Sequence, residues 1–358
     1  MARLLLPETQ RPAPADNVFI VASAYHLILA HILARAADVA PGTSVLLMKH
    51  QPVAHFRELF GAVRADSGIP FRDVFFLGRP GTKYKRRWRA MIDFTRIRGL
   101  RTLLAEARPK RLFVFNEDDL NQYASRWVKA RGGEVYAVED GAIAYTDQLL
   151  TATPSERIKS TLFFGPRNEA VPVEGSSRRI DRYYARFPNH LRSELSARAA
   201  AIPESDLGFF ETLRWPKDFM RRLGVNPETL WFDDLFLLAH SNNFRNVPEY
   251  RAGVRHRVAQ LAGQGRQVAV SYHPRERNPD WLELQPLGVK LIPHAVPSEF
   301  IPLFSRRRLS AVYGDIGTAL ITAKWVLKSV PIVSLMDTLN VADPPLRTLF
   351  EALGIEIR

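Results

Sequence analysis

Four short groups of polar and small residues stand beside strand-like apolar runs, in the places where ligand-binding residues occur in parallel α/β sheets. One group lies in the first half of the chain and three lie in the second half. Their side chains offer carboxylates, an imidazole and a hydroxyl, which are the groups that acid–base chemistry and phosphate binding require. The four groups are Glu139-Asp140-Gly141, His273-Pro274, Pro297-Ser298-Glu299 and Gly314-Asp315-Ile316-Gly317-Thr318.

The first group follows the apolar run EVYAV and places two carboxylates, Glu139 and Asp140, at the end of an expected strand. A sugar hydroxyl is a poor nucleophile, so its transfer needs a general base beside it, and a carboxylate can be that base. The alternative interpretation is a turn that ends the strand, because Asp-Gly is a common turn pair.

The second group follows the apolar run QVAVSY and presents His273 at a strand end. An imidazole there can donate a hydrogen bond to a phosphate oxygen and protonate or stabilise a leaving phosphate. Arg275 and Arg277 would add positive charge beside it. The alternative is a histidine that caps a helix or lies in a surface loop.

The last two groups stand at expected helix starts. Glu299 can accept hydrogen bonds from both hydroxyls of a ribose; alternatively, Ser298 caps the helix and Glu299 complements the helix dipole. The small residues of 314–318 would let backbone N–H groups approach a phosphate closely. This segment matches neither a Walker loop nor a GxGxxG loop.

Strand-like runs alternate with helix-like stretches in both halves, which predicts parallel sheets with right-handed crossovers. The expected fold class is α/β, with two Rossmann-like, doubly wound domains facing a cleft, the architecture called GT-B. The expected strands are 17–22, 44–48, 74–77, 111–115 and 134–138, followed by 234–239, 267–272, 289–292, 309–313 and 330–335.

The middle of the chain is rich in Pro, Arg and Ser and lacks strand periodicity. Residues 166–230 are therefore expected to form an irregular connection that carries helices such as 190–201. Residues 1–165 would form an N-terminal, acceptor-side domain, and residues 231–358 a C-terminal domain that binds the nucleotide donor.

The chain carries 50 Lys and Arg against 37 Asp and Glu, a formal net charge of +13, and its densest basic segment is 79–111. This segment is a solvated helix face, a surface for anionic lipid or an acidic glycan, or a nucleic-acid site. No helix-turn-helix, zinc-finger or aromatic RNA-binding signature is present, so a nucleic-acid partner is not expected.

Cysteine is absent, which excludes disulfides, thiolate zinc sites and cysteine nucleophiles. No apolar run approaches the roughly 20 residues that span a bilayer, and the first 17 residues are too short and too broken for a signal peptide. We therefore expect a soluble cytoplasmic protein, with peripheral attachment to the inner membrane as one role for the basic segment.

The triplet Glu139-Asp140-Gly141, the pair His273-Pro274 and a later hydroxyl position resemble the motifs of bacterial sialyltransferases and polysialyltransferases. The likeness spans most of the chain. The family has a pair of hydroxyl residues where this chain has Gly317-Thr318, so only Thr318 can supply a side-chain hydroxyl here.

The resemblance implies an inverting, metal-independent glycosyltransferase of capsule or lipooligosaccharide biosynthesis. It would move sialic acid, or a related nonulosonic acid, from a CMP-sugar to a glycan, polysaccharide or glycolipid hydroxyl. Asp140 would be the base, His273 would assist departure of the CMP phosphate, and Glu299 would bind ribose. The CMP-sugar is a co-substrate, and no cofactor or metal is implied. Further expected contacts are Pro274, Ser241, Asn242, Gly317 and Thr318 with the donor, and Ser23, Tyr25, His26 and Glu139 with the sugar or acceptor.

Two other functions fit the same residues. One is a GT-B transferase that uses CMP-Kdo or a UDP- or GDP-sugar. The other is a non-catalytic basic protein that binds a membrane or a polyanion. Release of CMP from a CMP-sugar distinguishes them, because the binding protein would release none.

Overall fold

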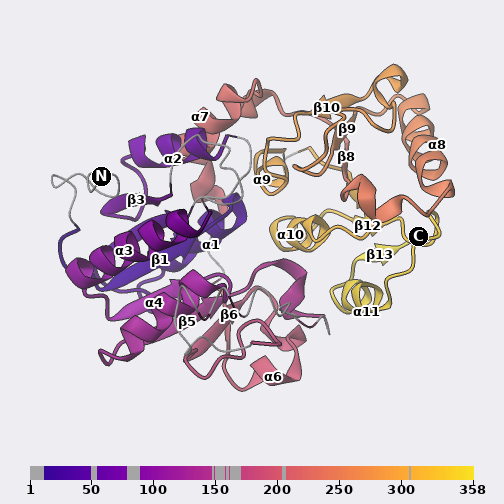
Figure 1. The fold of residues 1–358 in the computed structure, drawn as a ribbon. Coiled ribbons are helices and arrows are strands. Elements are labelled where there is room, and N and C mark those ends of the chain that lie inside the picture. The colour runs from indigo at the N-terminus through magenta and orange to yellow at the C-terminus, as the bar shows by residue number, and fades with distance from the viewer. Residues whose placement is uncertain are drawn as a thin grey trace. The chain divides into compact units, whose positions relative to one another are not determined.

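The chain forms two compact α/β units, each built on its own parallel sheet (Figure 1). The computed structural model describes residues 12–49, 55–78, 89–146, 149, 158, 161, 171–203, 207–305 and 308–358, with the side chains of 89–95 left out. Unit 1 comprises Met1–Pro52 and Ser67–Ser205, and unit 2 comprises Val53–Asp66 and Asp206–Arg358.

The sheet of unit 1 has seven strands in the order β3-β2-β1-β4-β5-β6-β7, all paired in parallel. All side chains of β1 and β2 are buried, as expected for central strands that helices cover on both faces. The strands are β1 (Asn17–Val21), β2 (Ser44–Lys49), β3 (Asp73–Leu77), β4 (Arg111–Val114), β5 (Glu134–Val138), β6 (Arg182–Ala185) and β7 (Ala199–Ala201).

Capping residues start two helices of unit 1 at the carboxyl ends of neighbouring strands. Helix α1 (Ala24–Arg35) follows β1, and the Ser23 hydroxyl accepts the N–H of His26 at 3.1 Å. Helix α4 (Asp119–Lys129) follows β4, where Asp118 accepts the N–H of Asn121 at 3.1 Å. From β1 the chain goes on to β2 and from β4 to β5, toward opposite edges of the sheet. The carboxyl ends of β1 and β4 are therefore the switch point at which α/β sheets form a ligand-binding crevice.

The other helical elements of unit 1 connect or follow these strands. They are α3 (Arg89–Ala107), α6 (Ser193–Ser196), and the short 3-10 turns η3 (Gly141–Ala144) and η4 (Pro188–His190).

Unit 2 repeats the doubly wound plan with six parallel strands in the order β10-β9-β8-β11-β12-β13. Its strand order reverses between β8 and β11, which defines a second crevice. The strands are β8 (Asp234–Leu237), β9 (Val268–Ser271), β10 (Lys290–Ile292), β11 (Ala311–Gly314), β12 (Ile332–Ser334) and β13 (Glu356–Ile357). The helices are α7 (Arg214–Arg222), α8 (Glu249–Gly263), α9 (Phe300–Ser305), α10 (Ala319–Val326) and α11 (Pro344–Ala352), with short turns η5 (Leu207–Glu211), η6 (Pro227–Thr229), η7 (Ser241–Phe244) and η8 (Gln285–Leu287).

Helix α2 (Phe56–Ala65) belongs to unit 2, although the chain reaches it between two strands of unit 1. It packs on α7, which buries Trp215 completely. The carboxylate of Asp66 is buried and accepts the N–H groups of Arg214 and Trp215 at 2.7 and 2.8 Å. Asp66 therefore accepts hydrogen bonds from two N–H groups at the start of α7, a helix that lies about 150 residues further along the chain.

The expected α/β class with two Rossmann-like units is confirmed. The expected irregular connection is wrong in part: 182–185 and 199–201 are strands β6 and β7 of the first sheet. The expected helix over 190–201 is also wrong, because α6 has four residues and the alanines after it pair with β6. Alanine favours helix in isolation, and tertiary pairing overrides that preference here.

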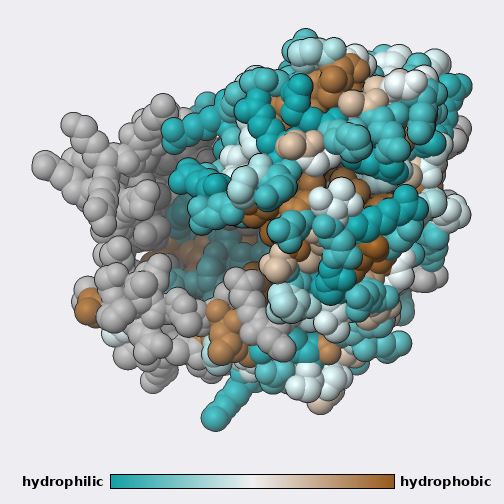
Figure 2. Space-filling view, turned by 90° about the vertical axis from the view of Figure 1, so that its right-hand side faces the viewer, coloured by the Kyte–Doolittle hydropathy of each residue, from teal (hydrophilic) through white to brown (hydrophobic). Residues whose placement is uncertain are grey.

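Figure 2 shows a face on which hydrophilic residues predominate and apolar residues form separate patches. Among the described residues, no helix has the length and apolar character needed to cross a membrane. The basic segment contributes α3, whereas its residues 79–88 lie outside the described ranges.

Candidate active site

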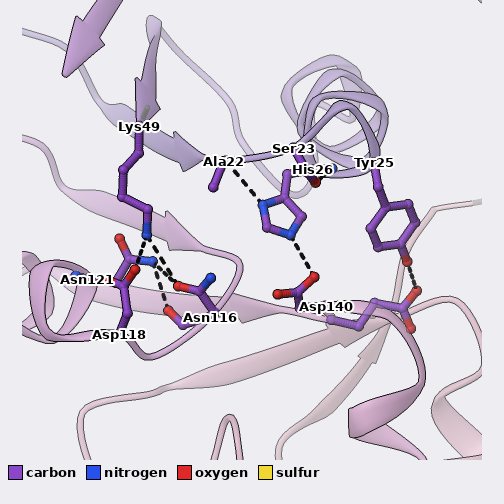
Figure 3. A network of polar contacts seen from close by, with 10 residues as sticks. Ala22, Ser23, Tyr25, His26, Lys49, Asn116, Asp118, Asn121 and Asp140 are labelled. Carbon is purple, nitrogen blue, oxygen red and sulfur yellow. Dashed lines mark hydrogen bonds and ion pairs between the residues drawn. The ribbon is translucent and has the colours of Figure 1, made fainter. Parts of the chain in front are cut away.

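Asp140 follows β5 and is held by the first turn of α1. Nε2 of His26 lies 2.9 Å from Oδ1 of Asp140 (Figure 3). Nδ1 of His26 accepts the N–H of Ala22 at 3.2 Å, which assigns the ring proton to Nε2, where it is donated to Asp140. The His26 side chain is 3% exposed and that of Asp140 is 37% exposed, so His26 holds a carboxylate that solvent still reaches. Gly141 has a φ of +72°, which lets the chain turn sharply after Asp140.

Asp140 is held in its charged form. Burial acts to raise the pKa of Asp140, but His26, Asn116 and Lys49 together lower the pKa below its ordinary value. The carboxylate is therefore ionised throughout the neutral pH range and can accept a proton there.

A polar network from β2 and the β4–α4 connection stands beside Asp140 (Figure 3). The ammonium of Lys49 pairs with Asp118 and lies 3.4 Å from Oδ1 of Asn116. Nδ2 of Asn121 donates to the backbone oxygen and to Oδ1 of Asn116, at 2.9 and 2.7 Å. Lys49 ends β2, Asn116 and Asp118 follow β4, and Asn121 lies in the first turn of α4, so a lysine and two amides stand near Asp140 at the carboxyl ends of these strands.

Glu139 has a different environment from its neighbour. Its carboxylate is completely buried, forms an ion pair with Arg186, and accepts hydrogen bonds from Tyr25 and Tyr145. The backbone N–H of Arg186 donates to it as well, at 3.2 Å. The sequence predicts that Glu139 and Tyr25 contact the sugar or acceptor. In the structure both side chains are buried and hydrogen-bonded to each other, and together with Arg186 they join α1, β5 and β6.

A further carboxyl near Asp140 is Glu174. It is buried, and its Oε1 has no hydrogen-bond partner. Burial, together with the charges of Asp140, Glu117 and Asp118, raises the pKa of Glu174 to about 8. At neutral pH this group is therefore a neutral carboxylic acid beside an ionised one.

Unit 2 brings two histidines together at the carboxyl ends of β8 and β9. The rings of His240 and His273 are 5.3 Å apart between centroids and nearly perpendicular. Nδ1 of His240 accepts the N–H of Asn242 at 3.0 Å, and Nδ1 of His273 accepts the N–H of Arg275 at 3.1 Å. Both rings therefore carry a proton on Nε2, away from these backbone bonds.

His273 is a neutral hydrogen-bond donor. Burial, with the nearby charges of Arg275 and His240, lowers the pKa of His273 to about 4. Glu276 ties the two loops together, since its carboxylate accepts the N–H of Ser241 at 3.1 Å. The Ser241 backbone N–H is thus already bonded within the protein, and its side chain is half-buried.

Asp315 follows β11 and links it to the segment after β8 and to α8. It is completely buried and accepts the N–H of Ala239 at 3.0 Å and the hydroxyl of Tyr250 at 2.6 Å. Burial raises the pKa of Asp315 to about 6, although hydrogen bonds, including those from the N–H groups of Ile316 and Gly317, act to lower it. Those two N–H groups point at Asp315 rather than at a ligand, unlike the phosphate-binding arrangement expected for this loop.

The remaining predicted donor contacts lie on unit 2. Thr318 is exposed at the start of α10, and its side chain makes no capping bond there. Asn242 and Pro274 are exposed beside the two histidines. Glu299 is half-buried in the turn before α9, which begins at Phe300 and so one to two residues after the expected start. The structure thus gathers His273 with the 240–242 segment, and it gathers Asp140 with His26.

Sequence reasoning missed Lys49, Asn116 and Glu174. Lys49 and Asn116 stand at or just after strand ends, so the same rule that found Asp140 would have found them. Glu174 carries no local signal, because its setting depends on the distant residues around it. Within the described residues, no three His, Asp or Glu side chains are grouped so that they could hold a metal ion.

Comparison by sequence gives no family: no family model matches the chain, and no curated protein matches it. Solved structures do match. UDP-GlcNAc 2-epimerase from Neisseria meningitidis bound to UDP-GlcNAc has a TM-score of 0.55 at 16% identity, over 95% of this chain and 86% of that one. The UDP-GlcNAc 2-epimerase from Methanocaldococcus jannaschii has a TM-score of 0.52 at 15% identity, over 95% and 92%.

The GT-B domain of a sialyltransferase from Photobacterium damselae matches equally well, with a TM-score of 0.52 at 12% identity, over 96% of this chain and 97% of that one. Identities this low establish the fold alone. The protein therefore has a GT-B-type fold of two Rossmann-like units.

Proposed function

We propose that this protein is an inverting, metal-independent glycosyltransferase that moves sialic acid, or a related nonulosonic acid, from a CMP-sugar to a glycan hydroxyl. The observation that carries the proposal is Asp140: an ionised, partly exposed carboxylate at the crevice of unit 1, held by a histidine whose tautomer is fixed. A GT-B-type fold supports it, because one of its structural neighbours is a sialyltransferase domain.

In the proposed reaction Asp140 takes the proton of the acceptor hydroxyl. The hydroxyl oxygen forms the new bond to the anomeric carbon while the bond from that carbon to the CMP phosphate oxygen breaks, which inverts the configuration. The pKa of Asp140 is low, so the carboxylate is a weak base. It therefore takes the proton only as the new bond forms, because bond formation makes the hydroxyl acidic.

Unit 2 would bind the CMP part of the donor. The neutral imidazole of His273 would donate its Nε2–H to the phosphate and stabilise the negative charge that CMP carries away, with Thr318 as a second donor. An imidazole with a pKa of about 4 is neutral at neutral pH and has no extra proton to give. The proposed role of His273 is therefore hydrogen bonding rather than proton transfer. Glu299 is the proposed ribose contact, and Pro274, Ser241, Asn242 and Gly317 are proposed to line the donor site.

Ser23 and His26 are proposed to lie near the sugar or acceptor, with His26 acting through Asp140. The acceptor would be a glycan, a polysaccharide or a glycolipid, as in capsule or lipooligosaccharide synthesis. Cytoplasmic location and peripheral attachment to the inner membrane complete the proposal, on the charge of the segment 79–111.

The test is incubation of the purified protein with CMP-sialic acid, CMP-Kdo and UDP-GlcNAc, with and without EDTA. The proposal expects slow release of CMP from CMP-sialic acid that EDTA does not change, and faster release with a suitable glycan. A second candidate is a UDP-sugar 2-epimerase, which a structural neighbour bound to UDP-GlcNAc favours. Epimerisation or cleavage of UDP-GlcNAc, with no CMP release from any CMP-sugar, would replace the proposal with this candidate.

A further inference from the structure

The side-chain amide of Asn116 lies between Lys49 and Asp140 (Figure 3). Its Oδ1 receives hydrogen bonds from Nδ2 of Asn121 at 2.7 Å and from Nζ of Lys49 at 3.4 Å. An amide with donors on its oxygen cannot flip without losing them and turning its own NH2 group toward those donors. The Asn116 NH2 group is therefore fixed on the other side, toward Asp140.

Lys49 is an unusual residue to find at this place. It ends the buried strand β2, and its side chain is only 6% exposed. Burying an ammonium group is costly unless it is paired, and Asp118 pairs with it. Asp118 also caps α4, so the ion pair fixes Lys49 to the start of that helix beside Asn116.

We propose that Lys49 and Asn116 are positioning residues for Asp140: Lys49 fixes the amide of Asn116, and that amide orients the Asp140 carboxylate for the substrate proton. The inference rests on the proposed role of Asp140 as the base. His26 from α1 donates to Asp140 at 2.9 Å, and the side-chain amide of Asn116, just after β4, lowers the pKa of Asp140 through its hydrogen bond. Each of these two donors is itself fixed by a second bond.

The charges around Asp140 give this arrangement a measurable signature. His26 and Lys49 are the charged groups that lower the pKa of Asp140, and Asn116 lowers it through its hydrogen bond. Removal of Lys49 takes away its charge and the fixed position of the Asn116 amide, so the pKa of Asp140 should rise. The charged groups that act on Asp140 are His26 from α1 and Lys49 from β2. Asp140 acts in turn on Glu174 from the 171–175 segment, which also faces Glu117 and Asp118 from the β4–α4 connection.

The first measurement is the titration of the Asp140 carboxyl carbon by NMR, assigned from its loss in Asp140→Asn. Lys49→Met and Asn116→Ala should each raise the pKa of Asp140 by about one. Lys49→Arg keeps the charge and should preserve most of the wild-type value. Lys129→Met is the matched control, because Lys129 pairs with Asp181 at 2.8 Å elsewhere in unit 1 and should leave Asp140 unchanged.

The second measurement is kcat against pH. In both variants the acidic limb should move up by about one pH unit, a loss of about tenfold at the lowest pH values, while KM for the donor stays constant. An unchanged Asp140 pKa in a folded Lys49→Met and in Asn116→Ala overturns the inference, even if transferase activity is present. A raised pKa in a protein that transfers no sugar supports the positioning arrangement and removes the proposed function instead.

Discussion

The buried carboxyl of Glu174 makes a strong prediction about stability. Replacing Glu174 with Gln keeps the size of the side chain and makes permanent the neutral form that the folded protein holds at neutral pH. In the unfolded chain Glu174 is ionised above its ordinary pKa of 4.5, whereas in the folded protein it keeps its proton up to a pKa of about 8. Unfolding in this range therefore releases a proton.

The sign follows from that release. A carboxyl whose pKa is raised by folding favours the folded state below the unfolded pKa, and this advantage is lost as the pH rises toward the folded pKa. Between these two values the wild type loses about 1.4 kcal/mol of unfolding free energy per pH unit on account of Glu174. From about pH 5.5 to about pH 7.5 the loss amounts to about 3 kcal/mol.

The assay is hydrogen exchange of the β5 and β6 amides, which reports the unfolding free energy of unit 1 at each pH. Glu174→Gln should remove most of that fall, so its advantage over the wild type should grow with pH. The exposed Glu134 provides the control, and Glu134→Gln should follow the wild-type curve. Parallel curves for the wild type and Glu174→Gln would refute the assignment of a protonated carboxyl at this position.

Four further outcomes are expected. Asp140→Asn should reduce turnover by about 10²–10⁴-fold with little change in CMP affinity, measured by CMP release and calorimetry, and near-normal turnover would remove it as the base. His273→Asn keeps an acceptor where Nδ1 stands but loses the distal N–H, so CMP binding should weaken about five- to tenfold, whereas the longer His273→Gln should lose less and the exposed His256→Gln should lose nothing. Gly317→Ser should fold normally, since an added Cβ would lie 3.5 Å from the nearest atom, and the new hydroxyl should tighten CMP binding by up to about tenfold; a lower melting temperature without tighter binding contradicts this. Asp66→Ala should cost about 1–3 kcal/mol, visible as faster hydrogen exchange in unit 2, and an effect confined to unit 1 would contradict the packing of α2.

Apolar runs mark buried parallel strands clearly, so the sequence predicted which residues follow the strand ends of both sheets. It placed Asp140 and His273 where they stand. It gave no means of separating Glu139 from Asp140, which are neighbouring carboxylates in the sequence. Successive residues of a strand point to opposite faces, so one of the pair enters the protein and the other reaches the crevice.

The partners of these residues could not be predicted, because each lies far away in the chain. His26 and Asp140 are 114 residues apart, and the role of His26 depends on a bond from Ala22 that only the folded turn provides. Strand β7 was missed for a related reason: three alanines have no strand pattern, and pairing with β6 alone makes them a strand. The neutral state of Glu174 depends on surrounding carboxyl groups that no local pattern connects.

The position of α2 has a consequence for the order in which the protein folds during synthesis. The ribosome makes α2 early, yet the N–H groups that Asp66 binds belong to residues 148 and 149 positions later. At roughly 5–20 residues per second, the apolar face of α2 waits about 7 to 30 seconds for α7. During that time the segment 53–66 must remain a loop that unit 1 does not incorporate. Unit 1 can be completed before most of unit 2 exists, whereas unit 2 needs a helix that was made before most of unit 1.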